Sequence, residues 1–406
     1  MTAVMSGIRI LEVAEHTFVP AASAVLADWG ADVVKVEHVE RGDAMRGLAS
    51  TGVVNLSGVV HVLLEHSNRG KRSIGLDLGT DEGRAILYRL AAVSDVFLTN
   101  KGPRVRQSLR IDVDDIRAHN PDIVYVRGSG WGARGPDADR GGYDILGYWC
   151  RPGLAYATKS PDAERPPMQP GPAYGDSIGA MTIAGGISAA LLHRERTGEA
   201  VEVDVSLLAT GMWAMGAGIA LSLQTGVPCE QVAGTDLIRN PLTHQYRTSD
   251  DRWIMLCCLQ GFEYWPDACR VVEQPDLVDD PRFSSYEALW EHAPEAVKIL
   301  QDEFAKHTFD EWRERLSNFR GQWSPVLSSV ESPEDPQALA NGYVQDVQTK
   351  DGVPFRLVAT PVQFGGEPSA PRRAPEFNEH GDTILTEELG LDWDSVIELK
   401  VKGVVA

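Results

Sequence analysis

The feature that most constrains the fold is a regular alternation of strand-like and helix-like segments in the first part of the chain. Short runs rich in Val, Ile and Leu alternate with amphipathic stretches that carry helix start and stop signals, such as Pro20 and Gly30 around one helix and Thr80 before another. The predicted strands are 8–13, 32–37, 95–100, 122–130 and 201–206. Alternating strands and helices form a parallel sheet covered on both faces. We therefore predict an α/β fold.

The rest of the chain is less regular. Residues 133–175 are rich in Gly and Pro, and a helix of small residues is predicted over 176–196. The apolar stretch 207–223 is shorter than the ~20 residues that span a bilayer, so we expect it in a core or a dimer interface. A smaller unit follows at 251–325, in which the neighbouring Cys257 and Cys258 lie in a strand-like run and are expected to be buried.

The charge of the chain disfavours polyanionic partners, but two local basic segments indicate an anionic ligand. Lys and Arg number 38 against 58 Asp and Glu, a net charge of -20, which disfavours nucleic acids and anionic membranes. Two short segments without acids, 68–73 and 101–110, interrupt this background near predicted strand ends. They supply Arg69, Lys71, Arg72, Lys101, Arg104, Arg106 and Arg110. Such cations suit phosphate oxygens, so these basic segments predict an anionic ligand, although solvated basic loops are the alternative.

Several observations favour a cytoplasmic protein without a metal. No apolar run approaches the length of a membrane span, and Glu12 and Glu15 lie where a signal sequence would be apolar. The five cysteines are odd in number and irregularly spaced, which argues against a disulfide framework or a zinc site. We expect reduced thiols in the cytoplasm.

One glycine motif resembles a dinucleotide fingerprint but lacks its context. Gly128, Gly130 and Ala133 follow a predicted strand in GxGxxA spacing. That motif needs a helix directly afterwards to hold the pyrophosphate, and the next residues are RGPDADRGG. We expect a turn-forming glycine loop instead.

Two aspartates at glycine-rich positions are candidates for chemistry. Asp176, in the run YGDS, lies at the start of the small-residue helix, where it is either a helix N-cap or an ionised nucleophile. Asp144 ends the loop GYD, where it either orients a reacting group or stabilises the loop. His16 and His38 follow early strands, but no triad or metal spacing includes them.

Taken together, these segments resemble the family III CoA-transferases, which include formyl-CoA transferases, carnitine CoA-transferases and α-methylacyl-CoA racemases. The resemblance extends over nearly the whole chain. It rests on GIRILEVAEHTFVPAASAVLADWGADVVKVEHVERGDAMRG, NRGKRSIGLDLGTDEGRAIL, SDVFLTNKGP, YGDSIGA and LVATPVQFGGEP with APEFNEHGDTIL, in that order.

The resemblance implies a fold and an assembly. It implies a large Rossmann-like domain with a parallel sheet, built from both chain ends, plus a smaller α/β domain, in an interlocked homodimer. The expected division is 1–223 for the first part of the large domain, 224–250 for a linker, 251–330 for the small domain, and 331–406 for the return linker and the C-terminal part of the large domain.

The resemblance also implies a reaction. Asp176 would attack the thioester of an acyl-CoA, and CoA would pass through an aspartyl anhydride and an aspartyl-CoA thioester to an acceptor carboxylic acid. CoA is then a substrate, and no permanently bound cofactor is expected. The matching positions supply Tyr143, Asp144, Thr17 and Gly175 as supporting residues and His38, Arg69, Lys71, Arg72, Asn100, Lys101 and Arg106 as CoA-binding residues.

The chain departs from the family pattern at informative positions. Thr17 replaces a Gln, Lys101 an aromatic or Arg, and Ser108 an Arg. The racemases have a His where this chain has Tyr143, and a tyrosine with a pKa near 10 is a poor base at neutral pH, which favours transfer over racemisation. The glycine-rich flap of the formyl-CoA enzymes is absent, which favours an acid larger than formate or oxalate. A racemase and a non-catalytic CoA-binding protein remain the alternatives.

Overall fold

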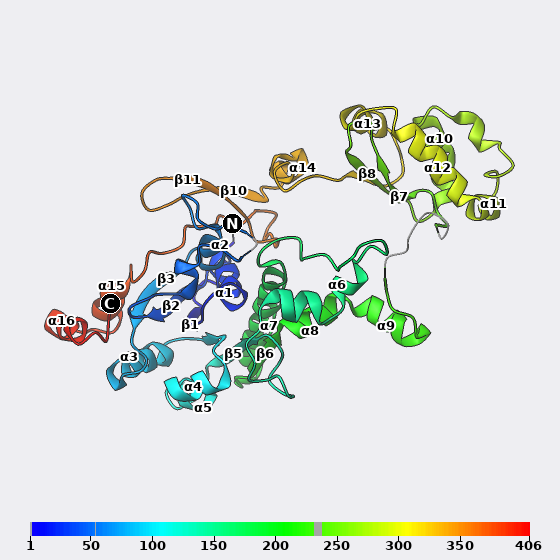
Figure 1. Cartoon of the computed structure of the whole chain (residues 1–406). Helices are drawn as coiled ribbons and strands as arrows, with labels where there is room; N and C mark the ends of the chain where they lie inside the picture. Colours follow the sequence, from blue (N-terminus) through cyan, green and yellow to red (C-terminus); the bar gives the residue numbers. More distant parts are fainter. Residues whose placement is uncertain (1, 53, 231–237) are drawn as a thin grey trace. The chain divides into compact units, whose positions relative to one another are not determined.

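The structure is a computed structural model that describes residues 2–52, 54–230 and 238–406, and it contains two compact units (Figure 1). The large unit comprises the described residues of 1–159, 163–230 and 337–406. The small unit comprises 160–162 and the described residues of 231–336. Each unit has its own hydrophobic core.

The large unit is built on a six-stranded sheet in the order β3-β2-β1-β4-β5-β6, with every pair of neighbours parallel. The strands are β1 (Arg9–Val13), β2 (Asp32–His38), β3 (Arg72–Leu76), β4 (Val96–Thr99), β5 (Val124–Ser129) and β6 (Glu202–Ser206). This is the order of a Rossmann-like sheet, in which the chain reverses its direction of winding between β1 and β4. The predicted parallel α/β fold is confirmed.

Side chains alternate between two cores because successive residues of a strand point to opposite faces. On one face, Ile10, Val33 and Val96 pack against α1 (Phe18–Asp28) and α7 (Tyr174–Thr197). On the other face, Leu11 and Phe97 pack against a second layer of helices. That layer contains α3 (Asp81–Ala92), α5 (Val113–Arg117) and α16 (Trp393–Val401). By length and composition α7 could cross a bilayer, but its buried face is part of the first core.

The C-terminal segment completes the large unit. After the hairpin of β10 (Val344–Gln348) and β11 (Pro354–Val358), the chain returns through α15 (Gly381–Thr383) and a π-helix at Ile384–Glu388 to α16. The end of the chain bonds to β3 and the turn after it: the Ala406 amide donates to the Gly75 carbonyl at 3.3 Å, and the Asp77 amide donates to the Val404 carbonyl at 2.9 Å.

The small unit is an antiparallel sheet with helices. The sheet has the order β7-β8-β9, formed by Thr243–Arg247, Trp253–Cys257 and Trp323–Pro325. The helices are α10 (Gly261–Val271), α11 (Tyr286–Glu291), α12 (Ala293–Phe304) and α13 (Phe309–Leu316). Cys258 is buried, whereas Cys257 is exposed, which corrects the prediction that both are buried, because neighbouring residues of an extended chain face opposite ways.

The remaining elements show where local signals were incomplete. The last two residues of the basic segment 68–73 begin β3 (Arg72–Leu76), and most of the second basic segment forms α4 (Pro103–Leu109). The apolar stretch 207–223 is two helices, α8 (Leu207–Ala214) and α9 (Gly216–Thr225), bent by 68° at Met215.

The irregular stretch 133–175 contains a π-helix at Ile145–Cys150 and α6 (Leu154–Ala157). The other short elements are α2 (Val62–Asn68), α14 (Pro336–Ala340) and 3-10 turns at Ala44–Gly47, Pro275–Val278 and Ser332–Glu334.

A buried ionic cluster lies beneath the loop that follows β1. The Lys35 ammonium, fully enclosed, donates to Glu12 Oε1 at 2.7 Å and to the Ala14 carbonyl at 2.8 Å, and it pairs with Asp43 Oδ2 at 2.7 Å. Lys71 reaches the other oxygen of Glu12 at 2.8 Å. Burial by itself lowers the pKa of Lys35, but Asp43 and Glu12 raise it above its ordinary value, so Lys35 is charged. The cluster ties β1, β2 and the chain around Asp43 together.

Replacing Lys35 with Met should destabilise the protein strongly. The change leaves two buried carboxylates without their shared cation, and breaking a buried pair in this way costs about 3–5 kcal/mol. Urea unfolding should show a clearly lowered midpoint. Lys402→Met, which removes a surface cation paired with Glu398, is the control and should shift the midpoint little. Equal midpoints for the two variants would contradict the role assigned to Lys35.

Candidate active site

The candidate site begins where the sheet reverses its winding, at the carboxyl ends of β1 and β4. Asn100, directly after β4, bridges the two loops: its Oδ1 accepts from the Glu15 amide at 3.2 Å, and its Nδ2 donates to the Glu15 carbonyl at 2.6 Å. Thr99 Oγ1 donates to the Val13 carbonyl at 2.8 Å. In open α/β sheets this crevice is where ligands bind.

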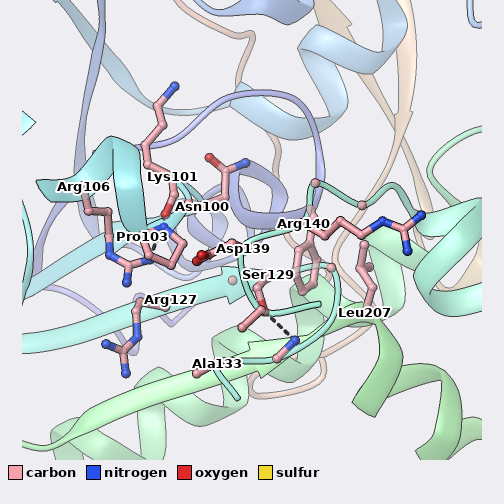
Figure 2. A pocket seen from close by; sticks show the side chains of 18 of the residues that line it. Asn100, Lys101, Pro103, Arg106, Arg127, Ser129, Ala133, Asp139, Arg140 and Leu207 are labelled. Atoms are coloured by element: carbon pink, nitrogen blue, oxygen red, sulfur yellow. Dashed lines mark hydrogen bonds between the residues drawn. The ribbon is translucent and has the colours of Figure 1, made fainter. Parts of the chain in front are cut away.

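A cavity of about 900 Å³ opens at this edge (Figure 2). Its wall comes from the loop after β1, from residues 100–107, from the end of β5 with the glycine loop behind it, and from Asp176. We call this the polar cavity. Figure 2 shows Lys101, Arg106 and Arg127 on one side of it and Arg140 on the other.

Three of these cations are held by carboxylates of the protein. Lys101 pairs with Glu15 at 2.8 Å and Arg106 with Asp112 at 3.1 Å. Arg127 lies 2.8 Å from Glu202 and 3.3 Å from Asp204. These pairs fix the three cations in the cavity wall.

Arg140 differs from these three cations. Its side chain is 68% exposed and lies 3.4 Å from Asp137. It is therefore the cation of the wall that is most open to a ligand.

Asp176 occupies the third position of α7, and it is not the helix cap. The helix begins at Tyr174, two residues earlier than predicted, after Ala173, whose φ of 58° is left-handed and which provides no side-chain cap. The N-cap alternative for Asp176 is therefore wrong. Its carboxyl is partly accessible to the cavity. Burial by surrounding protein, and then the nearby charge of Asp144, raise its pKa well above the ordinary value for aspartate.

Asp144 performs the capping role instead, from outside the helix. Its Oδ2 accepts from the Gly175 amide at 3.2 Å and from Gln169 Nε2 at 2.9 Å, while Oδ1 accepts from the Ile145 amide at 2.8 Å. A Cβ added to Gly175 would lie 2.5 Å from Tyr148 Cβ, so only glycine lets the first turn of α7 sit against that ring. Asp144 and Gly175 thus set where Asp176 lies.

His16 and Tyr143 lie beside Asp176. Their rings meet edge to face with centroids 5.8 Å apart. His16 holds a left-handed φ of 67°, which is strained for a residue other than glycine. The buried cluster holds it there, because Asp43 Oδ1 accepts from the His16 amide at 3.0 Å.

A second cavity, of about 530 Å³, lies on the other side of these residues. His16, Tyr143 and Asp176 line both cavities, so Asp176 belongs to their shared wall. We call this the apolar cavity because most of its wall is apolar or backbone. Its other lining residues are Thr17, Met45, Leu48, Ser50, Thr51, Val54, Leu63, Asp144, Ile145, Met168, Gln169, Pro170, Gly171, Pro172 and Ala173.

The structure therefore brings some of the predicted site residues together and places others elsewhere. Asp176 and Tyr143 line both cavities, Asn100, Lys101 and Arg106 line the polar one, and Thr17 and Asp144 line the apolar one. Gly175 contacts Asp144 from the first turn of α7. His38, Arg69, Lys71 and Arg72 line neither cavity.

The cations of the first basic segment are engaged inside the large unit. Arg69 pairs with Asp28 at 2.9 Å, and Lys71 is enclosed against Glu12. Arg72, at the start of β3, pairs with Asp32 on the neighbouring strand and with Glu388. Burial lowers the pKa of Lys71 to about 8, with Glu12 opposing and Lys35 adding to that effect.

Sequence reasoning missed several residues of the site. Arg127 and Arg140 were not singled out, although Arg127 lies in a strand whose end carries the glycine loop. No helix follows Gly130 in that loop, as expected. Gly130 lets two backbone segments lie close together, because a Cβ on it would lie 2.9 Å from the Gly142 Cα. The apolar cavity had no local signal because its wall comes from distant segments.

Within the described ranges 2–52, 54–230 and 238–406, no group of three His, Cys, Asp or Glu side chains could hold a metal ion.

The comparisons with known proteins agree with this geometry. Residues 5–381 match the model of CoA-transferase family III. The chain belongs to this family. That result confirms the resemblance described above and the assignment as an enzyme that transfers CoA.

Relatives and a solved structure support the same assignment along the whole chain. (R)-2-hydroxy-4-methylpentanoate CoA-transferase of Clostridioides difficile is 27% identical over 99% of both chains. Succinate--glutarate CoA-transferase of Agrobacterium fabrum is 30% identical over 94% of this chain and 95% of its own. A CAIB/BAIF family protein from Brucella suis is 26% identical, with a TM-score of 0.80 over 95% of this chain and 100% of that one.

The raised pKa of Asp176 predicts how CoA transfer depends on pH. Asp176 is the predicted nucleophile, and a carboxylate must be ionised to attack, so kcat/KM should rise with pH through the raised pKa of Asp176. Asp144→Asn removes the neighbouring charge and should lower that pKa, which moves the acidic limb of the profile to lower pH. Asp139→Asn, elsewhere in the wall of the polar cavity, is the matched control and should leave the limb in place. A limb that stays fixed or moves to higher pH in Asp144→Asn would contradict the prediction.

Proposed function

We propose that the protein transfers CoA from an acyl-CoA to a carboxylic acid through covalent intermediates on Asp176. One observation carries this proposal: Asp176 lies in the wall shared by a polar cavity with four cations and an apolar cavity. The CoA moiety would occupy the polar cavity, and the acyl group would reach Asp176 from the apolar side.

The proposed steps balance without a cofactor. The Asp176 carboxylate attacks the thioester carbonyl, the C–S bond breaks, and a mixed anhydride and CoA thiolate form. The thiolate attacks the aspartyl carbonyl, which releases the donor acid and leaves an aspartyl-CoA thioester. The acceptor carboxylate then attacks this thioester, the C–S bond breaks, and a second mixed anhydride and CoA thiolate form. The thiolate attacks the acceptor's acyl carbonyl, which gives the new acyl-CoA and restores the Asp176 carboxylate.

The environment of Asp176 supports this chemistry. A desolvated carboxylate is a stronger nucleophile than a hydrated one, and its raised pKa reflects that desolvation. Excluding water also protects the anhydride from hydrolysis. The protein's main contribution is positioning, which Asp144 and Gly175 provide at the start of α7.

For the CoA contacts we propose Asn100, Lys101 and Arg106 together with Arg140, because they line the cavity next to Asp176. His38, Arg69, Lys71 and Arg72 remain predictions from the family pattern, and their burial or distance from this cavity does not support direct contact. The names of the two relatives give different acids as substrates: a branched hydroxy acid for one and dicarboxylic acids for the other. Sequence identity to them therefore does not indicate which acid this protein uses.

We also propose that two copies associate, as the family resemblance implies. Helix α9 buries no residue; its Leu223 is 82% exposed, and Trp213 near the end of α8 is 86% exposed. A second copy of this chain would cover this apolar face. The interlocked form of the dimer and the cytoplasmic location remain predictions; all five cysteines are free, which supports a reducing compartment.

The covalent intermediate can be trapped. Incubation with an acyl-CoA and hydroxylamine should convert Asp176 to its hydroxamate, which peptide mass spectrometry would locate. Asp176→Ala should lower transfer by about 10³-fold or more, as expected for loss of a nucleophile. Asp122→Asn, an exposed aspartate outside both cavities, is the control. Full transfer activity in Asp176→Ala would disprove the proposal.

One observation bears on the racemase alternative. His16 shares both cavities with Asp176, so a second proton-transferring side chain is present even though Tyr143 replaces the racemase histidine. We expect no exchange of the α-proton of an acyl-CoA in deuterated buffer without an acceptor acid. Exchange that depends on both His16 and Asp176, tested with His16→Ala and Asp176→Asn, would establish racemisation instead.

A further inference from the structure

The apolar cavity has a composition that selects among carboxylic acids. Met45 and Leu63 are buried and belong, with Ala173, to a compact apolar cluster against which Leu48 and Val54 pack. Met168 and Ile145 extend this surface around the cavity. Its volume of about 530 Å³ lies within the range of cavities that enclose small organic ligands, and it exceeds what a one- or two-carbon acid fills.

No lysine or arginine is among the described residues that line this cavity. The cation next to the lining residue Met45 is already engaged, because Arg46 forms two bonds with Glu37, at 2.7 and 2.8 Å. A second carboxylate on a substrate would therefore find no cation here.

Four of the polar side chains that line the cavity are unfavourable for another anion. Asp144 and Asp176 are both carboxyl groups. Ser50 Oγ donates to the Val54 carbonyl at 3.2 Å, and Gln169 Nε2 donates to Asp144 and to the Gly171 carbonyl, so these donors are occupied. Moving an ionised carboxylate from water into such a site costs much more than moving a methyl group, which gains free energy there.

We propose that the apolar cavity receives the acyl chain of the transferred acid and selects monocarboxylic acids with an aliphatic or aromatic chain over dicarboxylic acids. This inference rests on the proposed function, because it assigns the acyl side of the transfer at Asp176. The single carboxylate lies at Asp176, where it reacts, and the chain lies against Met45, Leu48 and Leu63.

Acids matched in length test this directly. With one acyl-CoA donor, kcat/KM is measured for pentanoate against glutarate and for hexanoate against adipate, with 3-phenylpropanoate as an aromatic acid. Each monocarboxylate should exceed its dicarboxylate partner by about 100-fold or more, because only the dicarboxylate leaves a buried charge unpaired. Glutarate or adipate used as well as, or better than, its partner would overturn the inference.

A substitution in the wall tests the cause of the selectivity. Leu48→Arg supplies the missing cation and should raise the use of adipate relative to hexanoate by at least about tenfold, the effect of one charge pair. Val93→Arg adds the same charge at an exposed position outside both cavities and should leave the ratio unchanged. An unchanged ratio in a folded Leu48→Arg variant would overturn the assignment of the acyl chain to this cavity.

The two proposals fail in different ways. Transfer to every acid without discrimination overturns the selectivity alone, while Asp176 still forms its hydroxamate. Absence of transfer with every pair, together with absence of the hydroxamate, overturns the proposed function and the inference with it.

Discussion

One buried ammonium group holds the parts of the site in register. Lys35 links Glu12 of β1, the carbonyl of Ala14 and the carboxylate of Asp43 from within the sheet. Asp43 in turn accepts from the amides of His16 and Met45, at 3.0 and 2.8 Å. His16 is part of the shared wall, and Met45 is part of the apolar cavity. A single desolvated charge thereby fixes a strained loop and an apolar wall at once. Glu12 also pairs with the buried Lys71, whereas Lys35 is the buried lysine that pairs with Asp43.

The sheet topology sets where the candidate site lies, and helix α7 adds Asp176 to it. The reversal between β1 and β4 opens a crevice at one edge, and Asn100 bonds its two loops together. The first turn of α7 brings Asp176 to that crevice from a segment some 70 residues beyond β4 in the sequence. Asp144 caps this turn and, after burial, also raises the pKa of Asp176, so one carboxylate both positions the proposed nucleophile and contributes to the pH range in which it is ionised.

Much of this architecture was predictable from the sequence, and the failures have physical causes. The spacing of the apolar residues predicted five of the six strands of the parallel sheet, and the family pattern pointed to Asp176. β3 was missed because its first residue, Arg72, follows two further cations and was taken for part of a loop, whereas it pairs across strands with Asp32. Arg69 and Lys71 looked like ligands for phosphate because their partners, Asp28 and Glu12, are distant in sequence and only the fold brings them together. Burial of a charge is a tertiary property, and no local pattern reports it.

The position of the chain end bears on how the protein is synthesised. The last residues bond to β3 and to the turn after it, and Val404 and Val405 are buried in the core that β3 and α3 share. The large unit therefore lacks part of its core until residues 404 and 405 have left the ribosome. The small unit draws nearly all of its residues from one continuous stretch, 231–336, and can fold while the remainder is still being made. The large unit is thus the last to mature, after the nascent chain has exposed the edge of β3 for the time it takes to synthesise more than 300 residues.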